Sequence, residues 1–349
     1  MPGERASPSA LARGVRRGPP VPGADAPVRA SVVICAHTQE RWAELRAAVS
    51  SVRGQTPPPH ELIVVVDHNA GLLELARATL PVTVVANAER SGLSGARNTG
   101  VRAASGDVIV FLDDDAAARP GWLGALVAPY TDPGVLGVGG RIEPDWRRGA
   151  PAWFPDEFLW VVGCSYLGLP ERPATVRNMI GANMSCRRDV LLEVGGFRSA
   201  LGRVGSFPLG GEETEFCIRA GQHFAGRSWW YEPGAVVRHT VPGERGTRRY
   251  FLRRCFAEGL TKARVSRFVG PGAALASERA YAARVLPRGV LRGAWDALRG
   301  DLAGLWRAVA IAAGLAAVAA GYAVGLASPR VRSSGEGPLA PAPPQEVIS

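Results

Sequence analysis

The sequence predicts an α/β protein with a mostly parallel sheet covered by helices on both faces, followed by a C-terminal helical segment that associates with a membrane. Short, continuously apolar runs alternate with helical stretches from Ser31 onward, which is the pattern of parallel strands buried on both faces. With 349 residues, 46% of them apolar, the chain can form one large core. After Pro287, apolar residues recur at helical spacing and an uncharged run follows.

The first half of the chain alternates expected strands with expected helices. Strands are expected over 31–36, 61–66, 82–86 and 108–112, and helices over 41–52, 72–78 and 95–104. In such sheets, ligands bind outside the carboxyl ends of the strands. Asp67 and Asp113–Asp115 each follow an expected strand directly. We therefore expect a ligand site at that edge.

The second half is less regular. Residues 137–197 are rich in Trp, Pro and Gly and are expected to form loops around a binding cleft. A helix is expected over 212–220, with Gly221 as its stop. Residues 235–237 resemble a short strand.

The net charge of +10 is concentrated between Arg238 and Arg299, where fourteen Arg and Lys face four acidic residues. Such a segment attracts nucleic acid, anionic lipid or a phosphate-bearing substrate, although a solvated surface has the same composition. Five widely spaced cysteines without a CxxC pair favour neither a disulfide framework nor zinc, and indicate a reducing cytoplasm. Residues 1–29, without the apolar core of a secretory signal, and residues 328–349 are expected to be a disordered lead-in and tail.

Residues 271–307 are expected to form a basic amphipathic helical region. Its apolar stripe, flanked by two arginines, consists of Leu291, Trp295, Leu298, Leu302, Leu305 and Val309. A helix in a membrane interface has this pattern, but so does a helix packed on the domain. Residues 308–327 carry no charge and could span a bilayer, whereas their ten Ala and three Gly also fit a buried or re-entrant hairpin. Gly321 and Gly325 would let two such helices approach in a homodimer.

The acidic run Asp113–Asp115 is the strongest chemical feature. Three adjacent carboxylates repel one another unless a cation or hydrogen bonds compensate, so the run predicts a site for Mg²⁺ or Mn²⁺. Side chains alternate in extended chain, so Asp113 and Asp115 can face one way while Asp114 turns aside. Three solvated acids in a turn are the alternative. The same cluster argues against nucleic acid as a partner, because it would repel phosphates.

Two further segments carry candidate site residues. The glycine-punctuated helix around Arg97 matches neither a P-loop nor a dinucleotide fingerprint; Arg97 can contact a diphosphate or form a structural ion pair. Glu212 and Glu213 begin a helix whose dipole favours their ionised form, so either could take a proton from an attacking hydroxyl. Acidic residues in a first turn also serve simply as helix starters.

Four ordered blocks resemble the family-2 glycosyltransferases of the GT-A fold. These are the opening strand 31–38, the Arg-Asn-Gly helix 94–100, the DxD position at 113–115 and the Glu-Asp-x-Asp position at 211–216. The resemblance implies a GT-A domain over 30–270. It also implies a uridine site at Thr38, Glu40 and Asp67, and a diphosphate near Arg97.

Further roles follow from the same resemblance. Asp113, with Asp114 beside it, would contact the nucleotide, and Asp115 and Asp113 would bind the metal. Glu213 stands at the position of the general base, although the family has Asp there, so the choice between Glu212 and Glu213 stays open. His239 occupies a place where some relatives supply a metal ligand; a lone His is more often structural.

The implied reaction is inverting transfer of a single sugar, since no Gln-x-x-Arg-Trp block of processive synthases is found. Residues 163–166 and 181–185 resemble prokaryotic glucosyl-dolichyl-phosphate glucuronosyltransferases. The expected donor is a UDP-sugar carrying glucuronic acid or another hexose. The expected acceptor is lipid-linked, or a glycan, at the cytoplasmic face of a membrane. The alternatives are a non-catalytic nucleotide-sugar-binding protein and a sugar nucleotidylyltransferase, whose glycine-rich loop is absent from 35–41.

Overall fold

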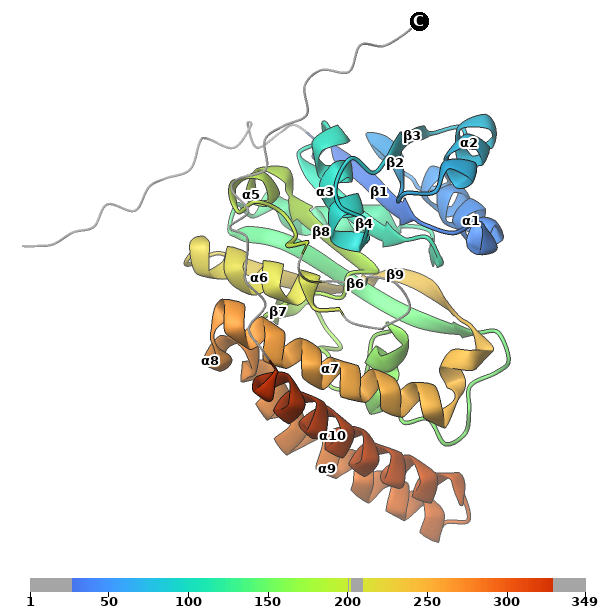
Figure 1. The fold of residues 1–349 in the computed structure, drawn as a ribbon, viewed down its shortest axis with the longest axis vertical. Coiled ribbons are helices and arrows are strands. Elements are labelled where there is room, and N and C mark those ends of the chain that lie inside the picture. The colour runs from blue at the N-terminus through green and yellow to red at the C-terminus, as the bar shows by residue number, and fades with distance from the viewer. Residues whose placement is uncertain (1–26, 200, 202–209, 329–349) are drawn as a thin grey trace, which may run out of the picture.

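A computed structural model describes residues 27–199, 201 and 210–328. They form one mixed sheet with helices on both faces and a layer of long C-terminal helices beside it (Figure 1). The strand order is β3-β2-β1-β4-β8-β6-β9-β5, and β7 pairs with β9. The expected lead-in and tail lie outside the described residues, apart from 27–29 and Ser328.

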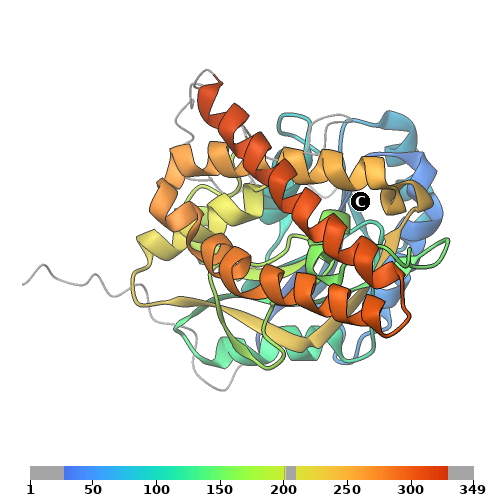
Figure 2. The same ribbon diagram turned by 90° about the horizontal axis from the view of Figure 1, so that it is seen from below.

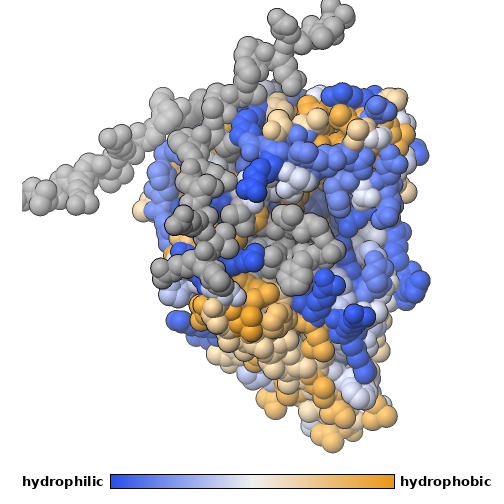
Figure 3. All heavy atoms as spheres, viewed as in Figure 1, coloured by the Kyte–Doolittle hydropathy of each residue, from blue (hydrophilic) through white to orange (hydrophobic). Residues whose placement is uncertain are grey.

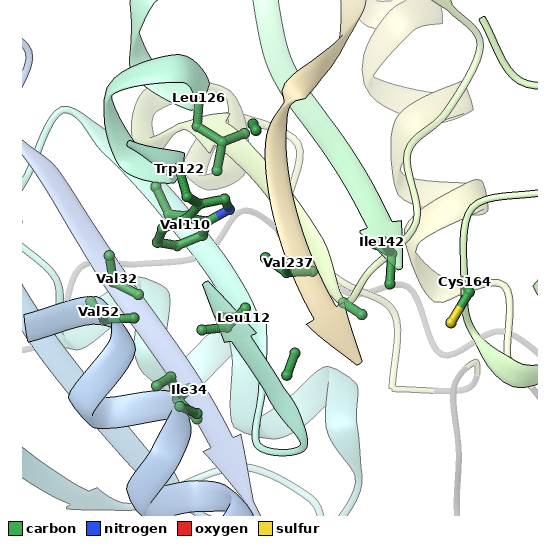
Figure 4. Packing of buried hydrophobic residues seen from close by; sticks show 14 of the residues in the cluster. Val32, Ile34, Val52, Val110, Leu112, Trp122, Leu126, Ile142, Cys164 and Val237 are labelled. Carbon is green, nitrogen blue, oxygen red and sulfur yellow. The ribbon is translucent and has the colours of Figure 1, made fainter. Parts of the chain in front are cut away.

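The N-terminal half of the sheet is parallel, as the sequence predicts. Its strands are β1 (Ala30–Ala36), β2 (Glu61–Val66), β3 (Thr83–Ala86) and β4 (Val108–Asp113), and its helices are α1 (Trp42–Arg53), α2 (Ala70–Thr79) and α3 (Leu93–Ala103). Alternate side chains of the central strands enter two separate cores. Val32 and Ile34 of β1 pack beside Val52 of α1 and Leu112 of β4 (Figure 4), whereas Val33 faces the α3 side.

The remaining strands make the sheet mixed. They are β5 (Ala116–Ala118), β6 (Val135–Trp146), β7 (Ala174–Val176), β8 (Asn183–Arg187) and β9 (Ser228–Val241). The prediction of loops throughout 137–197 was wrong for β6 and β8, which pair in the middle of the sheet. Three glycines, Gly137, Gly139 and Gly140, interrupt the apolar pattern of β6, so this strand is not recognisable from the sequence. Each allows a close approach, and a Cβ at Gly140 would clash with the Ala235 carbonyl and the Asn183 amide.

Shorter helices complete the domain: α4 (Trp122–Val127), α5 (Arg188–Glu193), α6 (Glu212–His223) and the 3-10 helices η1 (Gln39–Arg41), η2 (Ala128–Thr131), η3 (Asp156–Val162) and η4 (Gly243–Gly246). Helix α6 begins at Glu212, as expected, but continues past Gly221 for two residues. All five cysteines carry free thiols.

Four helices form the C-terminal layer: α7 (Arg248–Val269), α8 (Pro271–Ala274), α9 (Ala276–Leu298) and α10 (Ala303–Ala327). Helices α9 and α10 form a hairpin, and α10 lies along α7 (Figures 1 and 2). The predicted apolar stripe is therefore divided between two helices. Among the described residues, α10 is the one helix long and apolar enough to cross a membrane. Gly321 and Gly325 pack on α7 of the same chain.

Candidate active site

A cavity of about 1230 Å³ opens at the carboxyl ends of β1, β2 and β4. One wall consists of these strand ends and α3, and the other of α6, α7 and α9. The expected ligand site at the end of the parallel strands is therefore a real cavity. Pockets for a single ligand typically measure about 300–1000 Å³, and this cavity is somewhat larger.

The acidic turn between β4 and β5 lies on the first wall. Strand β5 pairs antiparallel with β9, which places Ala116 opposite His239. The Nε2 atom of His239 consequently lies 3.1 Å from Oδ1 of Asp115. Ligand atoms of Asp113, Asp115 and His239 lie within 4.8 Å of one another. Two carboxylates and an imidazole suit a divalent cation such as Mn²⁺; the fit is supported by a buried Asp114 oxygen without a partner among the described residues.

Arg41 forms ion pairs with two carboxylates of this turn, at 3.0 Å from Asp114 and 3.1 Å from Asp115. Burial raises the pKa of Asp114 to about 7, and the neighbouring Asp115 carboxylate adds to this effect. Burial would also raise the pKa of Asp115, but His239 and Arg41 hold it below its ordinary value. Burial alone would lower the pKa of His239, yet Asp115 raises it to about 10. The carboxyls of the turn are thus crowded together in a buried place, with Arg41, His239 and Arg245 against them.

Arg97 connects the acidic turn with the start of α6. Its guanidinium lies 3.0 Å from Oε1 of Glu212 and 3.5 Å from Oδ1 of Asp113, and it donates to the Gly181 carbonyl at 3.1 Å. The side chain is 3% exposed and packs over the rings of Phe111 and Phe197. The structural ion pair considered from the sequence is therefore present. Arg97 also lines the cavity, so this pair does not remove it from a ligand.

Glu212 and Glu213 differ in their surroundings. Glu212 is buried and paired with Arg97, and its Oε2 atom has no partner among the described residues. Glu213 is half-buried and lines the cavity. Burial raises the pKa of Glu213 to about 8, and the adjacent Glu212 adds to this effect. The expectation that the helix dipole keeps this carboxyl ionised was wrong, because desolvation and a like charge outweigh the dipole.

Asp67 lies at the end of β2 in a pocket of donors. It accepts hydrogen bonds from the side chain of Asn87 at 2.6 Å, the His68 ring at 2.8 Å and the Gly92 N–H at 2.8 Å. Burial opposes ionisation, but these donors lower the pKa of Asp67 below its usual value. An ionised carboxylate therefore faces the cavity at this end.

The structure does not bring all of the predicted uridine-site residues to the cavity. Thr38 caps η1 by accepting from the Glu40 N–H, and neither residue lines the cavity. His37 and Arg41, which flank them, do line it. The role given to Thr38 and Glu40 stays a prediction.

Comparisons with known proteins agree with this geometry. The family described as Glycosyl transferase family 2 matches residues 31–195. Glucosyl-dolichyl phosphate glucuronosyltransferase of Haloferax volcanii is 34% identical over 87% of this chain and 98% of its own length. The chain belongs to glycosyltransferase family 2. This family-2 glycosyltransferase is also 27% identical to succinoglycan biosynthesis protein ExoM of Rhizobium meliloti, over 66% of the chain and 73% of that protein.

A solved structure confirms the GT-A fold of this family-2 glycosyltransferase. It is a mannosyltransferase from Pyrobaculum calidifontis in complex with GDP-Man and Mn²⁺. The TM-score is 0.53 at 18% identity, covering 85% of this chain and 88% of that one. At this identity the likeness concerns the fold alone.

The second wall of the glycosyltransferase cavity holds charged residues that the sequence did not single out. Glu278 of α9 lies 2.6 Å from both Lys262 of α7 and Arg177, and Glu258 pairs with Arg254 at 2.9 Å. The i, i+4 spacing of Arg254, Glu258 and Lys262 was the available signal. Burial opposes these charges, but pairing lowers the pKa of Glu278 to about 2 and raises that of Lys262.

Proposed function

We propose that this glycosyltransferase moves one sugar from a UDP-sugar to a hydroxyl of a lipid-linked acceptor, with inversion at the anomeric carbon. The observation that carries the proposal is the convergence in one cavity of Asp113, Asp115 and His239 with Arg97 and Glu213. A cation site, a buried arginine and a carboxyl with a raised pKa are the three groups that displacement of a nucleoside diphosphate requires.

The first wall would bind the donor. Asp67, ionised at the end of β2, would accept from the uracil ring, and Asp113 with Asp114 would contact the ribose. Asp113, Asp115 and His239 would hold Mg²⁺ or Mn²⁺, whose positive charge would offset the charge of the departing diphosphate. Arg97 lies 3.5 Å from Asp113, so its guanidinium is in place to contact the diphosphate.

Glu213 is the better candidate for the base. Glu212 is tied to Arg97, and protonating it would cost that ion pair. Glu213 lines the cavity, and its pKa of about 8 suits a group that exchanges protons near neutrality. The family usually has Asp at the position of Glu213, so the side chain here is longer by one methylene.

In the proposed reaction one bond forms, one bond breaks and one proton moves, and Glu213 is the residue that accepts the proton. The acceptor oxygen forms a bond to the anomeric carbon while the bond from that carbon to the diphosphate oxygen breaks. The electron pair of the broken bond leaves with the nucleoside diphosphate, and the acceptor proton passes to a carboxylate oxygen of Glu213. Attack on the face opposite the leaving group inverts the anomeric configuration.

A lipid-linked acceptor is supported by three observations. The relative from Haloferax volcanii is named for a dolichyl phosphate acceptor. The cavity is larger than a typical pocket for one ligand, and its second wall includes apolar residues of the α9–α10 hairpin, Leu286 and Leu315. The third observation is that a cation, Arg254, lines the cavity. Arg248, by contrast, lies outside it, over the rings of Trp153 and Trp306.

The test is a panel of nucleotide-sugars incubated with the protein, Mn²⁺ and lipid-linked sugars, with release of nucleoside diphosphate and the anomeric configuration of the product measured. We expect a UDP-sugar to be consumed with inversion, and only when metal and lipid acceptor are both present. Retention would exclude the direct displacement. Tight nucleotide-sugar binding without product would instead identify a non-catalytic binding protein, and pyrophosphate release from UTP a nucleotidylyltransferase.

A matched pair of variants tests the base. Glu213→Gln is expected to reduce transfer by about 10²–10⁴-fold while nucleotide binding is unchanged. Glu74→Gln, an exposed residue on α2 outside the cavity, is the control and should behave as the wild type. If Glu212→Gln abolishes transfer but Glu213→Gln does not, the base is Glu212.

A further inference from the structure

The turn of the α9–α10 hairpin gathers large apolar side chains on the protein surface. Leu298 and Leu302, on either side of the turn, are 81% and 72% exposed, and Leu291, Trp295, Leu305 and Trp306 surround them. The same end of the hairpin forms an apolar tip in Figure 3. A contiguous exposed apolar patch on a folded domain marks a contact with a membrane or another protein.

Helix α10 is held along α7 over most of its length. The contacts are close enough to need glycine: Gly314 lies against Phe251, Gly321 against the Phe256 backbone, and Gly325 against Ala263. The two helices therefore run parallel, and α7 accompanies α10 from residue 251 to residue 263. This packing ties the position of α10 to that of α7.

Helix α7 cannot enter a bilayer together with α10. The stretch of α7 beside α10 carries Arg253, Arg254, Glu258 and Lys262, and the last three line the cavity. Charged side chains are strongly disfavoured in hydrocarbon. An α10 that crossed the membrane would have to leave α7, expose its glycines and open the wall of the cavity.

The charge of the hairpin suits an anionic membrane surface. Residues 276–327 contain six arginines and three acidic residues. Two of these acids, Asp296 and Asp301, are already paired with Arg307, and Arg292 is paired with Glu157 outside the hairpin. Arg299 lies over the ring of Trp295 at the tip. Tryptophan and arginine beside exposed leucines are typical of segments that lie at the level of lipid headgroups.

We propose that the turn of the α9–α10 hairpin inserts into one leaflet of an anionic bilayer, and that α10 stays packed on α7 without crossing the membrane. A second copy of this chain fits the patch less well, because a two-fold contact would bring the Arg299 side chains of two like tips to the same interface. The inference does not depend on the proposed reaction, since lipid binding is measured without substrates.

The first experiment is sedimentation of the purified full chain with phosphatidylcholine vesicles, with and without phosphatidylglycerol. We expect binding that needs the anionic lipid and that falls at least about tenfold in the double variant Leu298→Glu and Leu302→Glu, because two leucines leave the acyl boundary. Leu252→Glu is the control, since this leucine is 42% exposed but lies on α7. Thermal unfolding must show that all variants stay folded.

The outcomes separate the alternatives. If Leu252→Glu weakens binding as much as the double variant does, or if neither changes it, the hairpin turn is not the docking surface. If the double variant abolishes a dimer in size-exclusion chromatography and leaves vesicle binding unchanged, the patch covers a second copy. Either result overturns the proposal.

The second experiment asks whether α10 crosses the membrane. Epitopes are placed at both ends of the chain, and sealed vesicles from expressing cells are treated with protease. We expect the two epitopes to be cleaved from the same side of the membrane. If one epitope is protected until detergent is added while the other is cleaved, α10 spans the bilayer and the proposal fails.

Discussion

The two walls of the cavity handle buried charge in opposite ways. On the wall of strand ends the three carboxyls of Asp113–Asp115 crowd together, and the pKa of Asp114 is raised to about 7 by burial and by Asp115. Between α7 and α9 on the helical wall, Glu258 and Glu278 each lie beside cations, and the pKa of Glu278 falls to about 2 despite burial, mainly through Lys262. The crowded carboxyls of the first wall suit a divalent cation, whereas the ion pairs between α7 and α9 compensate one another and hold the helical wall in place.

Removing a carboxylate from the first wall should have the largest effect on activity. Asp115→Ala takes away the residue that His239 and Arg41 both contact. Because a bound metal contributes several kcal/mol to the transition state, we expect transfer to fall about 10³-fold. Calorimetry should show that Mn²⁺-dependent nucleotide binding is lost as well. Glu74→Ala on α2 is the control. Normal turnover of the Asp115→Ala protein would show that the metal site takes no part in the reaction.

Removing the cation from the second wall should affect stability instead. Lys262→Met leaves Glu258 and Glu278 facing each other with less compensation. Leaving a buried charge without a partner costs about 3 kcal/mol or more; Arg177 and Arg254 remain beside the two glutamates, so the expected loss is smaller than that. Urea unfolding should show this loss, while nucleotide binding stays normal. Adding Glu278→Gln should restore part of the stability. The two walls would not differ as described if Lys262→Met weakened nucleotide binding as strongly as Asp115→Ala.

This stability difference should also depend on pH. The pKa of Glu278 is lowered on folding, so its contribution is fully present above the unfolded value near 4.5 and is lost as pH falls toward 2. The gap in unfolding free energy between wild type and Lys262→Met should therefore narrow in acid. A constant gap from neutrality down to that pH would mean that Glu278 is not the partner that matters.

The same contrast explains what could be predicted from sequence. The carboxylates of the first wall follow apolar strands directly, so a general rule about strand ends located Asp67 and Asp113–Asp115. Arg177 and Glu278 of the second wall are 101 residues apart, and no local pattern connects them. The periodic pattern of apolar residues also did not predict β6, because glycines interrupt it. It predicted a single apolar stripe where the structure has two helices, α9 and α10.

The proton-accepting role of Glu213 predicts a rise of activity with pH. The carboxyl can act as a base only when deprotonated, and its pKa is raised to about 8 by burial and Glu212. The ratio kcat/KM, which reports the free enzyme, should increase about tenfold per unit below that pKa, roughly a hundredfold over two units, and then level off. The matched Glu213→Gln protein should lack this limb. If the limb persists in that variant, another group titrates.

The smallest predicted effect tests the packing that holds the second wall. A Cβ at Gly321 would meet the Phe256 carbonyl, so Gly321→Ala should push α10 from α7 and cost about 1–2 kcal/mol. Gly124→Ala is the matched control, because Gly124 is also helical and nothing lies near its added Cβ. It should stabilise the protein by about 0.5–1 kcal/mol. Denaturant unfolding of both variants separates steric contact from helix propensity. Equal stabilisation by both would mean that α10 does not rest on α7 in solution, and the second wall would then lack its support.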